Sequence, residues 1–175
     1  MDILSLDDAT RLTNTRSVAD FFDGPQWIYS SEERIYLIPK DSGAKVGLAK
    51  TLGNLFATRG PCLLWINEPH IWASAEQLDI FTRYRLSHGE GRALSEAPLH
   101  YFEGSQDCES LVSIMCISLF FVWGFEIAAL DGSAAITVSH DEWLDYRSAQ
   151  VSNFATEFKR WIKPLLHLSN AEMRS

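Results

Sequence analysis

The sequence predicts an α/β fold, with a single domain over residues 1–175 and a mixed sheet of about five strands flanked by helices. Helix-type and strand-type segments alternate along the chain, as they do where helices cover a central sheet. The run CLLWI at 62–66 is continuously apolar, which indicates a strand buried on both faces. Two predicted hairpins argue against a purely parallel sheet, so we expect a mixed one.

Helix signals occur from one end of the chain to the other. Ser5 is a favourable N-cap, and Asp7 and Asp8 place negative charge at the positive end of the helix dipole. Ser74, followed three residues later by Gln77, has the spacing of a capping box. The expected helices cover residues 5–22, 44–58, 75–87, 105–124 and 150–166.

Strand signals lie between these helices. Two aromatic and β-branched runs, 27–29 and 34–38, are separated by polar residues and predict a hairpin. The turn dipeptide Asp131-Gly132 predicts a second hairpin. The expected strands cover residues 27–29, 34–38, 62–66, 125–130 and 134–138, and residues 92–104 are expected to be irregular or to contain a short strand.

One apolar segment has nearly the length of a membrane span. Residues 111–130 read LVSIMCISLFFVWGFEIAAL, close to the roughly 20 residues that a span requires. Gly124 interrupts the run, Glu126 lies inside it, and no Lys or Arg anchors its acidic flanks. We therefore expect a buried helix followed by a buried strand, and no membrane partner.

Charge and cysteine content limit the function classes. The chain has 15 Lys and Arg against 23 Asp and Glu, for a net charge of −8. A general nucleic-acid binder needs a basic face, so nucleic acid is not an expected partner. The three cysteines lack paired metal spacing, and the N-terminus lacks the basic region of a signal peptide. These features predict a cytoplasmic protein with reduced thiols and no cofactor.

The stretch VSHDEW contains a serine, a histidine and two acids in a row, as an active site does. Three consecutive residues cannot form a Ser-His-Asp triad, because neighbouring side chains point in different directions. The spacing of Ser139 and Glu142 instead fits a capping box, with Asp141 beside the positive end of the helix dipole. We expect a strand leading into a capped helix, which leaves His140 without a local role.

Negative charge is concentrated in one part of the chain. Residues 93–146, a stretch of 54 residues, contain nine acids and no Lys or Arg, while the rest of the chain has 14 acids and 15 bases. An acidic surface would attract a basic partner and accelerate its association. Chance segregation is the alternative explanation. The predicted partner-binding residues are Glu103, Asp107, Glu109, Asp131, His140, Asp141 and Asp145.

The loop after CLLWI offers a different kind of site. Ligands of open α/β sheets bind beyond the carboxyl ends of strands, and Glu68 with His70 would supply an acid and a base there. An ordinary polar loop explains the same residues. The candidate ligand-site residues are Glu68, His70, Trp72, Arg83 and Arg85.

Several blocks of the chain resemble a family of small uncharacterised bacterial cytosolic proteins. The blocks are LLWINEPHIW, RYRLSHGEGR, SEAPLHYF, FVWGFEI and VSHDEW, and they occur in consistent order between residues 62 and 143. The resemblance implies no established activity, cofactor or catalytic residue. Members of the family resemble the single-domain cytosolic proteins found beside bacterial toxin genes, which is an association only.

Two functions follow from these observations. The first is a protein-binding accessory protein, of the immunity or antitoxin type, which occludes a basic partner such as a nuclease toxin and has no catalytic or metal-binding residues. The second is an enzyme or small-ligand-binding protein with its site near the strand ends. A structural subunit, with homodimerisation through an aromatic face, is a third possibility.

Overall fold

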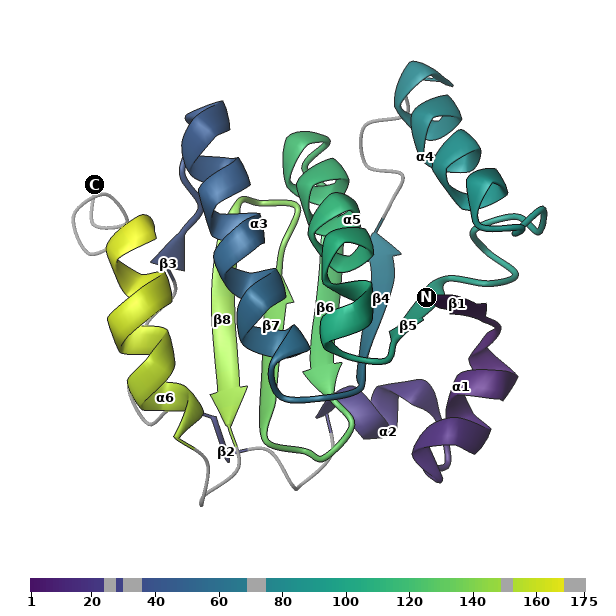
Figure 1. Cartoon of the computed structure of the whole chain (residues 1–175), viewed down its shortest axis with the longest axis horizontal. Coiled ribbons are helices and arrows are strands. Elements are labelled where there is room, and N and C mark those ends of the chain that lie inside the picture. The colour runs from purple at the N-terminus through teal and green to yellow at the C-terminus, as the bar shows by residue number, and fades with distance from the viewer. Residues whose placement is uncertain (24–27, 30–35, 69–74, 149–152, 169–175) are drawn as a thin grey trace.

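A nine-stranded sheet forms the centre of the molecule (Figure 1). The computed structural model describes residues 1–23, 28–29, 36–68, 75–148 and 153–168. The strand order is β1-β5-β4-β6-β7-β8-β3-β9, and β2 pairs with β8 beside this path. The strands are β1 (Asp2–Leu4), β2 (Ile28–Tyr29), β3 (Tyr36–Leu37), β4 (Cys62–Glu68), β5 (Leu99–Phe102), β6 (Gly124–Ala129), β7 (Ala134–Val138), β8 (Trp143–Ser148) and β9 (His167–Leu168).

The sheet confirms the predicted class of helices packed on a sheet and corrects two details. Every strand pairing among the described residues is antiparallel, so the expected mixed sheet is wrong. The strand count also exceeds five. Of the strands outside the five expected, β1 and β9 have two or three residues, too few to show the alternation that predicts a strand, β5 lies in the segment expected to be irregular or to contain a short strand, and β8 occupies residues expected to begin a helix.

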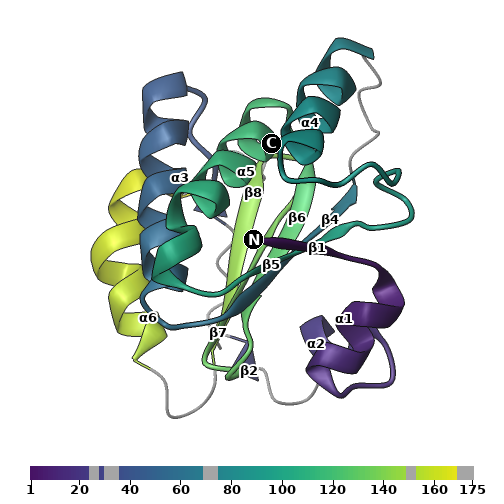
Figure 2. The same ribbon diagram turned by 45° about the vertical axis from the view of Figure 1, so that its right-hand side comes forward.

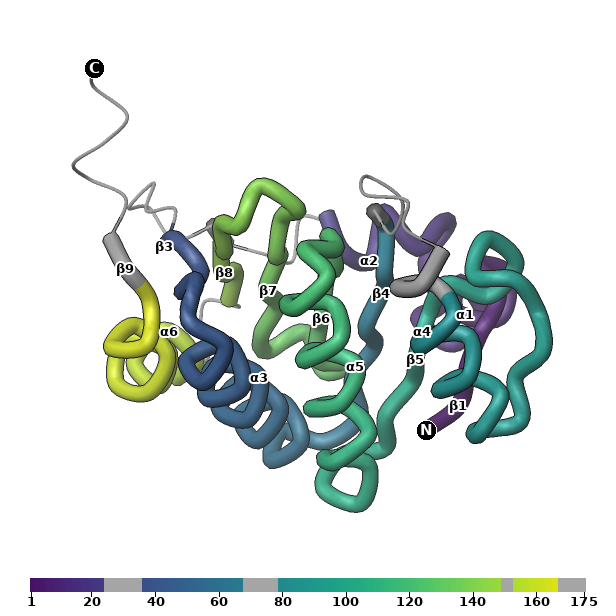
Figure 3. Tube along the Cα trace, turned by 90° about the horizontal axis from the view of Figure 1, so that it is seen from above, coloured from purple at the N-terminus to yellow at the C-terminus, as the bar shows by residue number. Residues whose placement is uncertain are grey.

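Helices cover both faces of the sheet (Figures 1 and 3). α3 (Ser42–Ala57), α5 (Cys108–Phe120) and a C-terminal helical segment lie on one face. α1 (Leu6–Thr13) and α2 (Val18–Asp23) lie on the other, as Figure 2 shows from the side. α4 (Ala75–Ser87) stands beside the β5 end of the sheet, and its bounds are those the sequence predicts.

The central strands bury both of their faces, as the apolar run CLLWI predicts. Leu64 and its cross-strand neighbour Ile127 belong to the larger core beneath α3 and α5. Leu63 and its neighbour Ala128 belong to the smaller core, which contains Phe22 of α2. Because successive strand residues point to opposite faces, two covered faces require an uninterrupted apolar sequence.

The N-terminal helix expected over 5–22 is two helices. Ser5 is the N-cap as predicted, accepting from the Asp8 N–H at 3.2 Å. The chain then turns at Asn14, which has a φ of 53° and ends α1. Asparagine adopts this left-handed conformation more readily than most other residues, and it is therefore common at the ends of helices.

The hairpin expected from 27–29 and 34–38 is wrong. β2 and β3 both pair with β8, which places them one after the other along the same side of β8. Residues 30–35 lie outside the described part of the chain. The sequence could show two strand-type runs but not which third strand would pair with both of them.

The apolar segment 111–130 divides into a helix and a strand, as predicted. The helix ends at Phe120, and Gly124 is the first strand residue rather than the residue after the helix. Gly132 has a φ of 73° in the turn between β6 and β7, which confirms the second hairpin. None of the helices in the described residues is both long and apolar enough to traverse a bilayer.

The C-terminal helical segment is shorter and less regular than the helix expected over 150–166. It consists of α6 (Phe154–Glu157), a π-helical turn (Phe158–Ile162) and a 3₁₀ turn (Lys163–Leu165). Pro164 has no N–H to donate to the carbonyl of Arg160, so a regular α-helix cannot continue through it. Residues 149–152 lie outside the described part of the chain.

Two glycines of α3 provide a matched test of the contact between α3 and α5. A Cβ at Gly53 would lie 2.4 Å from Val112 Cγ2, whereas a Cβ at Gly47 would meet nothing within 4 Å. We expect Gly47→Ala to stabilise the protein by about 0.5–1 kcal/mol through helix propensity. We expect Gly53→Ala to destabilise it by roughly 1 kcal/mol net, because overpacking outweighs that gain.

Urea denaturation of the two variants measures both effects. Adding Val112→Ala to Gly53→Ala should recover much of the stability, because it removes the atom that the new methyl group meets. Equal stabilisation by Gly47→Ala and Gly53→Ala would show that the two helices are not in close contact at Gly53.

Candidate functional site

Residues 139–142 form the turn between β7 and β8, so the predicted capped helix is wrong. The Ser139 N–H donates to the Trp143 carbonyl at 2.9 Å, and the Glu142 N–H donates to the Ser139 carbonyl at 3.1 Å. The Ser139 hydroxyl accepts from the Asp141 N–H at 3.1 Å. Pairing of the five residues Leu144–Ser148 with β7 outweighs the local helix-start pattern, because Leu144 and Tyr146 then enter the core.

Glu142 reaches across to α3 rather than back to Ser139. Its Oε1 accepts from Lys45 Nζ at 3.0 Å, and Lys45 Nζ also donates to the Leu119 carbonyl at 3.0 Å. Lys45 thereby joins the start of α3, the end of α5 and the β7–β8 turn. His140 Nε2 lies 3.4 Å from Asp141 Oδ1 in the same turn and is half-buried.

The seven predicted partner-binding residues fall in three places. Glu103, Asp107, Glu109 and Asp131 lie at the end of the sheet where β5 and β6 finish and α5 begins. His140 and Asp141 lie at the opposite end, about 17 Å away along the five residues of β7. Asp145 is half-buried on β8 between them, and partial burial raises the pKa of its carboxyl group.

The first group, with Asp2, forms what we call the acidic end. Strand register brings its parts together, because Cys62 at the start of β4 pairs with Phe102 on one side and Ala129 on the other. The acidic end consists of Asp2, Glu103, Asp107, Glu109 and Asp131. Glu103, Glu109 and Asp131 are exposed.

Asp107 supports the backbone of the acidic end. Its Oδ2 accepts from the Glu103 N–H at 2.9 Å, and its Oδ1 accepts from the Met1 amine at 2.8 Å. Against the cost of partial burial, these two bonds hold the pKa of Asp107 below its ordinary value. Its carboxylate is therefore committed to the fold, which leaves the exposed acids for any partner.

A buried ion pair lies on the sheet face that carries α1 and α2. Arg147 NH2 donates to Glu126 Oε2 at 2.7 Å, and the two residues are 2% and 8% exposed. The same guanidinium donates through NH1 to the carbonyl of Phe22, which is near the end of α2. The pair thus fixes α2 to the sheet. Sequence reasoning missed it because only the β6–β7–β8 register places Glu126 near Arg147.

The predicted ligand site at the strand end is only partly described. The side chain of Glu68, and the whole of His70 and Trp72, lie outside the described part of the chain. The structure separates Arg83 from Arg85: the Arg83 side chain is 77% exposed and pairs with Asp79, whereas Arg85 is 3% exposed. Residues two apart on a helix point to nearly opposite sides, so the two arginines do not converge.

Arg85 lines a cavity of about 320 Å³ between the last turns of α4 and segment 90–95. Its NH2 donates to the Ala97 carbonyl at 2.9 Å, and its Cζ lies 5.8 Å from the centre of the Phe81 ring. Phe81 and Leu94, both buried, form apolar parts of the wall. Arg85 follows Phe81 by four residues, so the helical stripe that predicts a buried Phe81 also indicates a buried Arg85.

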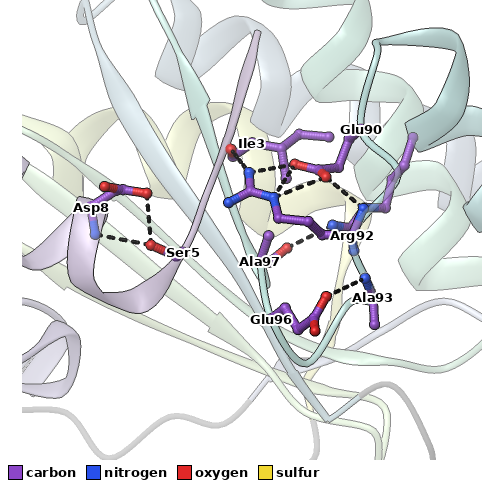
Figure 4. A network of polar contacts seen from close by, with 9 residues as sticks. Ile3, Ser5, Asp8, Glu90, Arg92, Ala93, Glu96 and Ala97 are labelled. Atoms are coloured by element: carbon purple, nitrogen blue, oxygen red, sulfur yellow. Dashed lines mark hydrogen bonds and ion pairs between the residues drawn. The ribbon is translucent and has the colours of Figure 1, made fainter.

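Glu90 and Arg92 form a closed pair at the edge of this cavity (Figure 4). Arg92 NH2 donates to Glu90 Oε2 at 2.5 Å and to the Ile3 carbonyl at 2.9 Å. The Arg92 N–H donates to Glu90 Oε1 at 2.7 Å. Hydrogen bonding from Arg92 lowers the pKa of Glu90 to about 2, so Glu90 is ionised at neutral pH.

Comparisons of the chain with protein-family models, with curated proteins and with solved structures found no match. Functional conclusions therefore rest on the residues and the geometry described above.

Proposed function

We propose that the protein is a protein-binding accessory protein that docks a basic partner on its acidic end. The observation that carries this proposal is the gathering of exposed acids, Glu103, Glu109 and Asp131, with Asp2 and Asp107 beside them, at one end of the sheet. An inhibitor of the immunity or antitoxin type, acting by occlusion of a toxin, is the form of this function that the family resemblance favours.

Charge accumulation at the acidic end supports an electrostatic docking role. Tyr101, on β5, lies among these acids: burial first, and then the negative charges of Glu103, Asp2 and Asp107, raise the pKa of its hydroxyl group. A surface of one sign increases the rate at which an oppositely charged protein is captured and favours one orientation on arrival. Such a surface thus suits rapid binding of a basic protein.

The aromatic ring of Tyr101 adds a second property of interfaces. It is half-buried beside exposed carboxylates, so apolar and charged groups occur together. Tyrosine is enriched among residues that contribute most to binding energy, because its ring is large and rigid and its hydroxyl can hydrogen-bond.

Charge reversal at the acidic end tests the proposal. The triple variant Glu103→Lys, Glu109→Lys and Asp131→Lys changes exposed side chains and leaves Asp107 in place. Wild type, immobilised, is used to capture basic proteins from an extract of the source cell, and the captured protein is then used for rate measurements. We expect the triple variant to slow association by about tenfold or more at low salt, and the difference to shrink at high salt.

A second triple variant is the matched control. Asp79→Lys, Glu96→Lys and Asp141→Lys change the net charge by the same amount at exposed positions away from the acidic end. We expect this variant to bind nearly as fast as wild type. Equal slowing by both variants would show that net charge alone matters, and no slowing by either would refute the electrostatic docking role.

A further inference from the structure

We propose that the cavity beside Arg85 is a binding site for a small organic monoanion, namely a carboxylate with an apolar body. The site lies on the opposite side of β5 from α1 and is built by α4 and segment 90–95 (Figures 1 and 4). It is separate from the acidic end, so this inference does not depend on the protein-binding role proposed above.

Arg85 carries a charge that the described residues do not neutralise by contact. Arg85 is 3% exposed, and within the described part of the chain its guanidinium makes one hydrogen bond, to the neutral Ala97 carbonyl, and no ion pair. Its Nε is buried and has no hydrogen-bond partner there. A buried charge without a counter-ion is strongly unfavourable, and so is a buried donor without an acceptor. An anion in the adjoining cavity would supply both the counter-ion for the guanidinium and an acceptor for Nε.

Glu90 is near but does not serve as the counter-ion. Both of its oxygens accept from Arg92: Nε lies 3.0 Å from each oxygen, and NH2 lies 2.5 Å from Oε2. The Glu90 N–H donates to the Arg85 carbonyl at 3.0 Å, but its carboxylate makes no hydrogen bond or ion pair with the Arg85 guanidinium in the described part of the chain, and burial lowers the pKa of Arg85 although the charge of Glu90 opposes this. Figure 4 shows its carboxylate directed at Arg92.

The surroundings of Arg85 define the class of ligand. One uncompensated guanidinium matches one negative charge, and the other lining cation, Arg92, is already paired with Glu90, so the second charge of a dianion such as a phosphate monoester would lack a partner among the described lining residues. Phe81 and Leu94 offer apolar surface to the rest of the molecule. A volume of about 320 Å³ is at the lower end for ligand pockets, which suits a molecule the size of benzoate.

Binding of benzoate by the purified full chain tests the proposal. Isothermal titration calorimetry and thermal unfolding are carried out with sodium benzoate, with the neutral isostere benzamide and with inorganic phosphate. We expect benzoate to bind and to raise the unfolding temperature with concentration, while benzamide and phosphate bind at least about tenfold more weakly.

Two arginine variants of α4 locate the site. Arg85→Met keeps an unbranched apolar stem against Phe81, and we expect it to raise the Kd of benzoate by about tenfold or more. Arg83→Met removes the same charge from an exposed position on the same helix and should leave the Kd unchanged. Because Arg85→Met removes an unpaired buried charge, the variant should also fold at least as stably as wild type in the absence of benzoate.

The outcomes separate clearly. Benzoate binding that is lost only in Arg85→Met supports the site. Equal binding of benzoate and benzamide, stronger binding of phosphate, or binding that survives Arg85→Met would each overturn the assignment. Failure of wild type to bind benzoate or any homologous monocarboxylate from butanoate to octanoate would overturn it as well.

Discussion

Arg147→Met is expected to destabilise the protein by about 3–5 kcal/mol in urea denaturation. Arg147 and Glu126 are both buried, and removal of the guanidinium leaves the Glu126 carboxylate without its cation in the interior. The Phe22 carbonyl also loses a donor, as does the Thr137 hydroxyl, which accepts from Arg147 NH2 at 2.7 Å. Methionine retains much of the volume, so the loss reflects charge and hydrogen bonding rather than a cavity.

The double variant Glu126→Gln with Arg147→Met is the control. It removes both charges, so we expect it to be more stable than Arg147→Met alone, although it is one substitution further from wild type. If the double variant were as unstable as the sum of the two single variants, the two side chains would not be coupled. We therefore expect the double variant to lose less stability than the sum of the two single variants. That difference is as informative as the size of the loss in Arg147→Met.

Lowering the pH from 7 to 5 is expected to cost the protein about 2 kcal/mol of stability through His100 alone. His100 is fully buried beside Phe81, and burial, followed by the positive charge of Arg85, lowers its pKa to about 3. The unfolded chain binds a proton at this histidine below about pH 6.5, whereas the folded protein does not until near pH 3. Stability from this group is thus complete above pH 6.5 and declines as the pH falls toward 3.

His100→Phe isolates that contribution. The variant retains a ring next to Phe81 but has no titrating group, so its stability should fall less between pH 7 and pH 5 than that of wild type. Chemical denaturation gives the loss of stability between pH 7 and pH 5 for wild type and for the variant. The difference between the two losses cancels the titration of other residues. Identical slopes for the two proteins would mean that His100 can become protonated without unfolding.

The fold was predictable where the signal is local and repeated. α4 has the predicted bounds, and the hairpin between β6 and β7 forms around Asp131-Gly132 as expected. Both depend on interactions between residues close in sequence. Antiparallel pairing of β4 with β5 and β6 could not be read in the same way, because one buried strand has the same apolar pattern whichever direction its neighbours run.

The stretch at 139–142 shows how a local pattern can mislead. Ser139 and Glu142 have the spacing of a capping box, but β8 follows immediately and is held by five cross-strand pairs with β7. A helix would have left that edge of the sheet without its neighbour and Tyr146 without the core. Tertiary pairing therefore outweighed a helix-start signal that is worth only about 1 kcal/mol.

The candidate sites were predictable only in part. The sequence shows that acids are concentrated in one stretch, but strand direction decides which end of the sheet each acid occupies, and so Asp141 and Asp131 are separated. Arg83 and Arg85 are the same residue type on one helix, and only packing distinguishes the exposed one from the buried one. The cavity beside Arg85 depends on segment 90–95 folding back, for which the sequence gives no signal.

The strand order also has a consequence for how the chain folds. β6, β7 and β8 are joined by two tight turns, whereas Asp2 of β1 pairs with Tyr101 and Tyr36 of β3 pairs with Leu144, each roughly a hundred residues away along the chain. Contacts of short sequence separation lose little chain entropy and form early. The β6–β7–β8 meander is thus the natural nucleus, and β1 and β3, which lie toward the two edges of the finished sheet, join last.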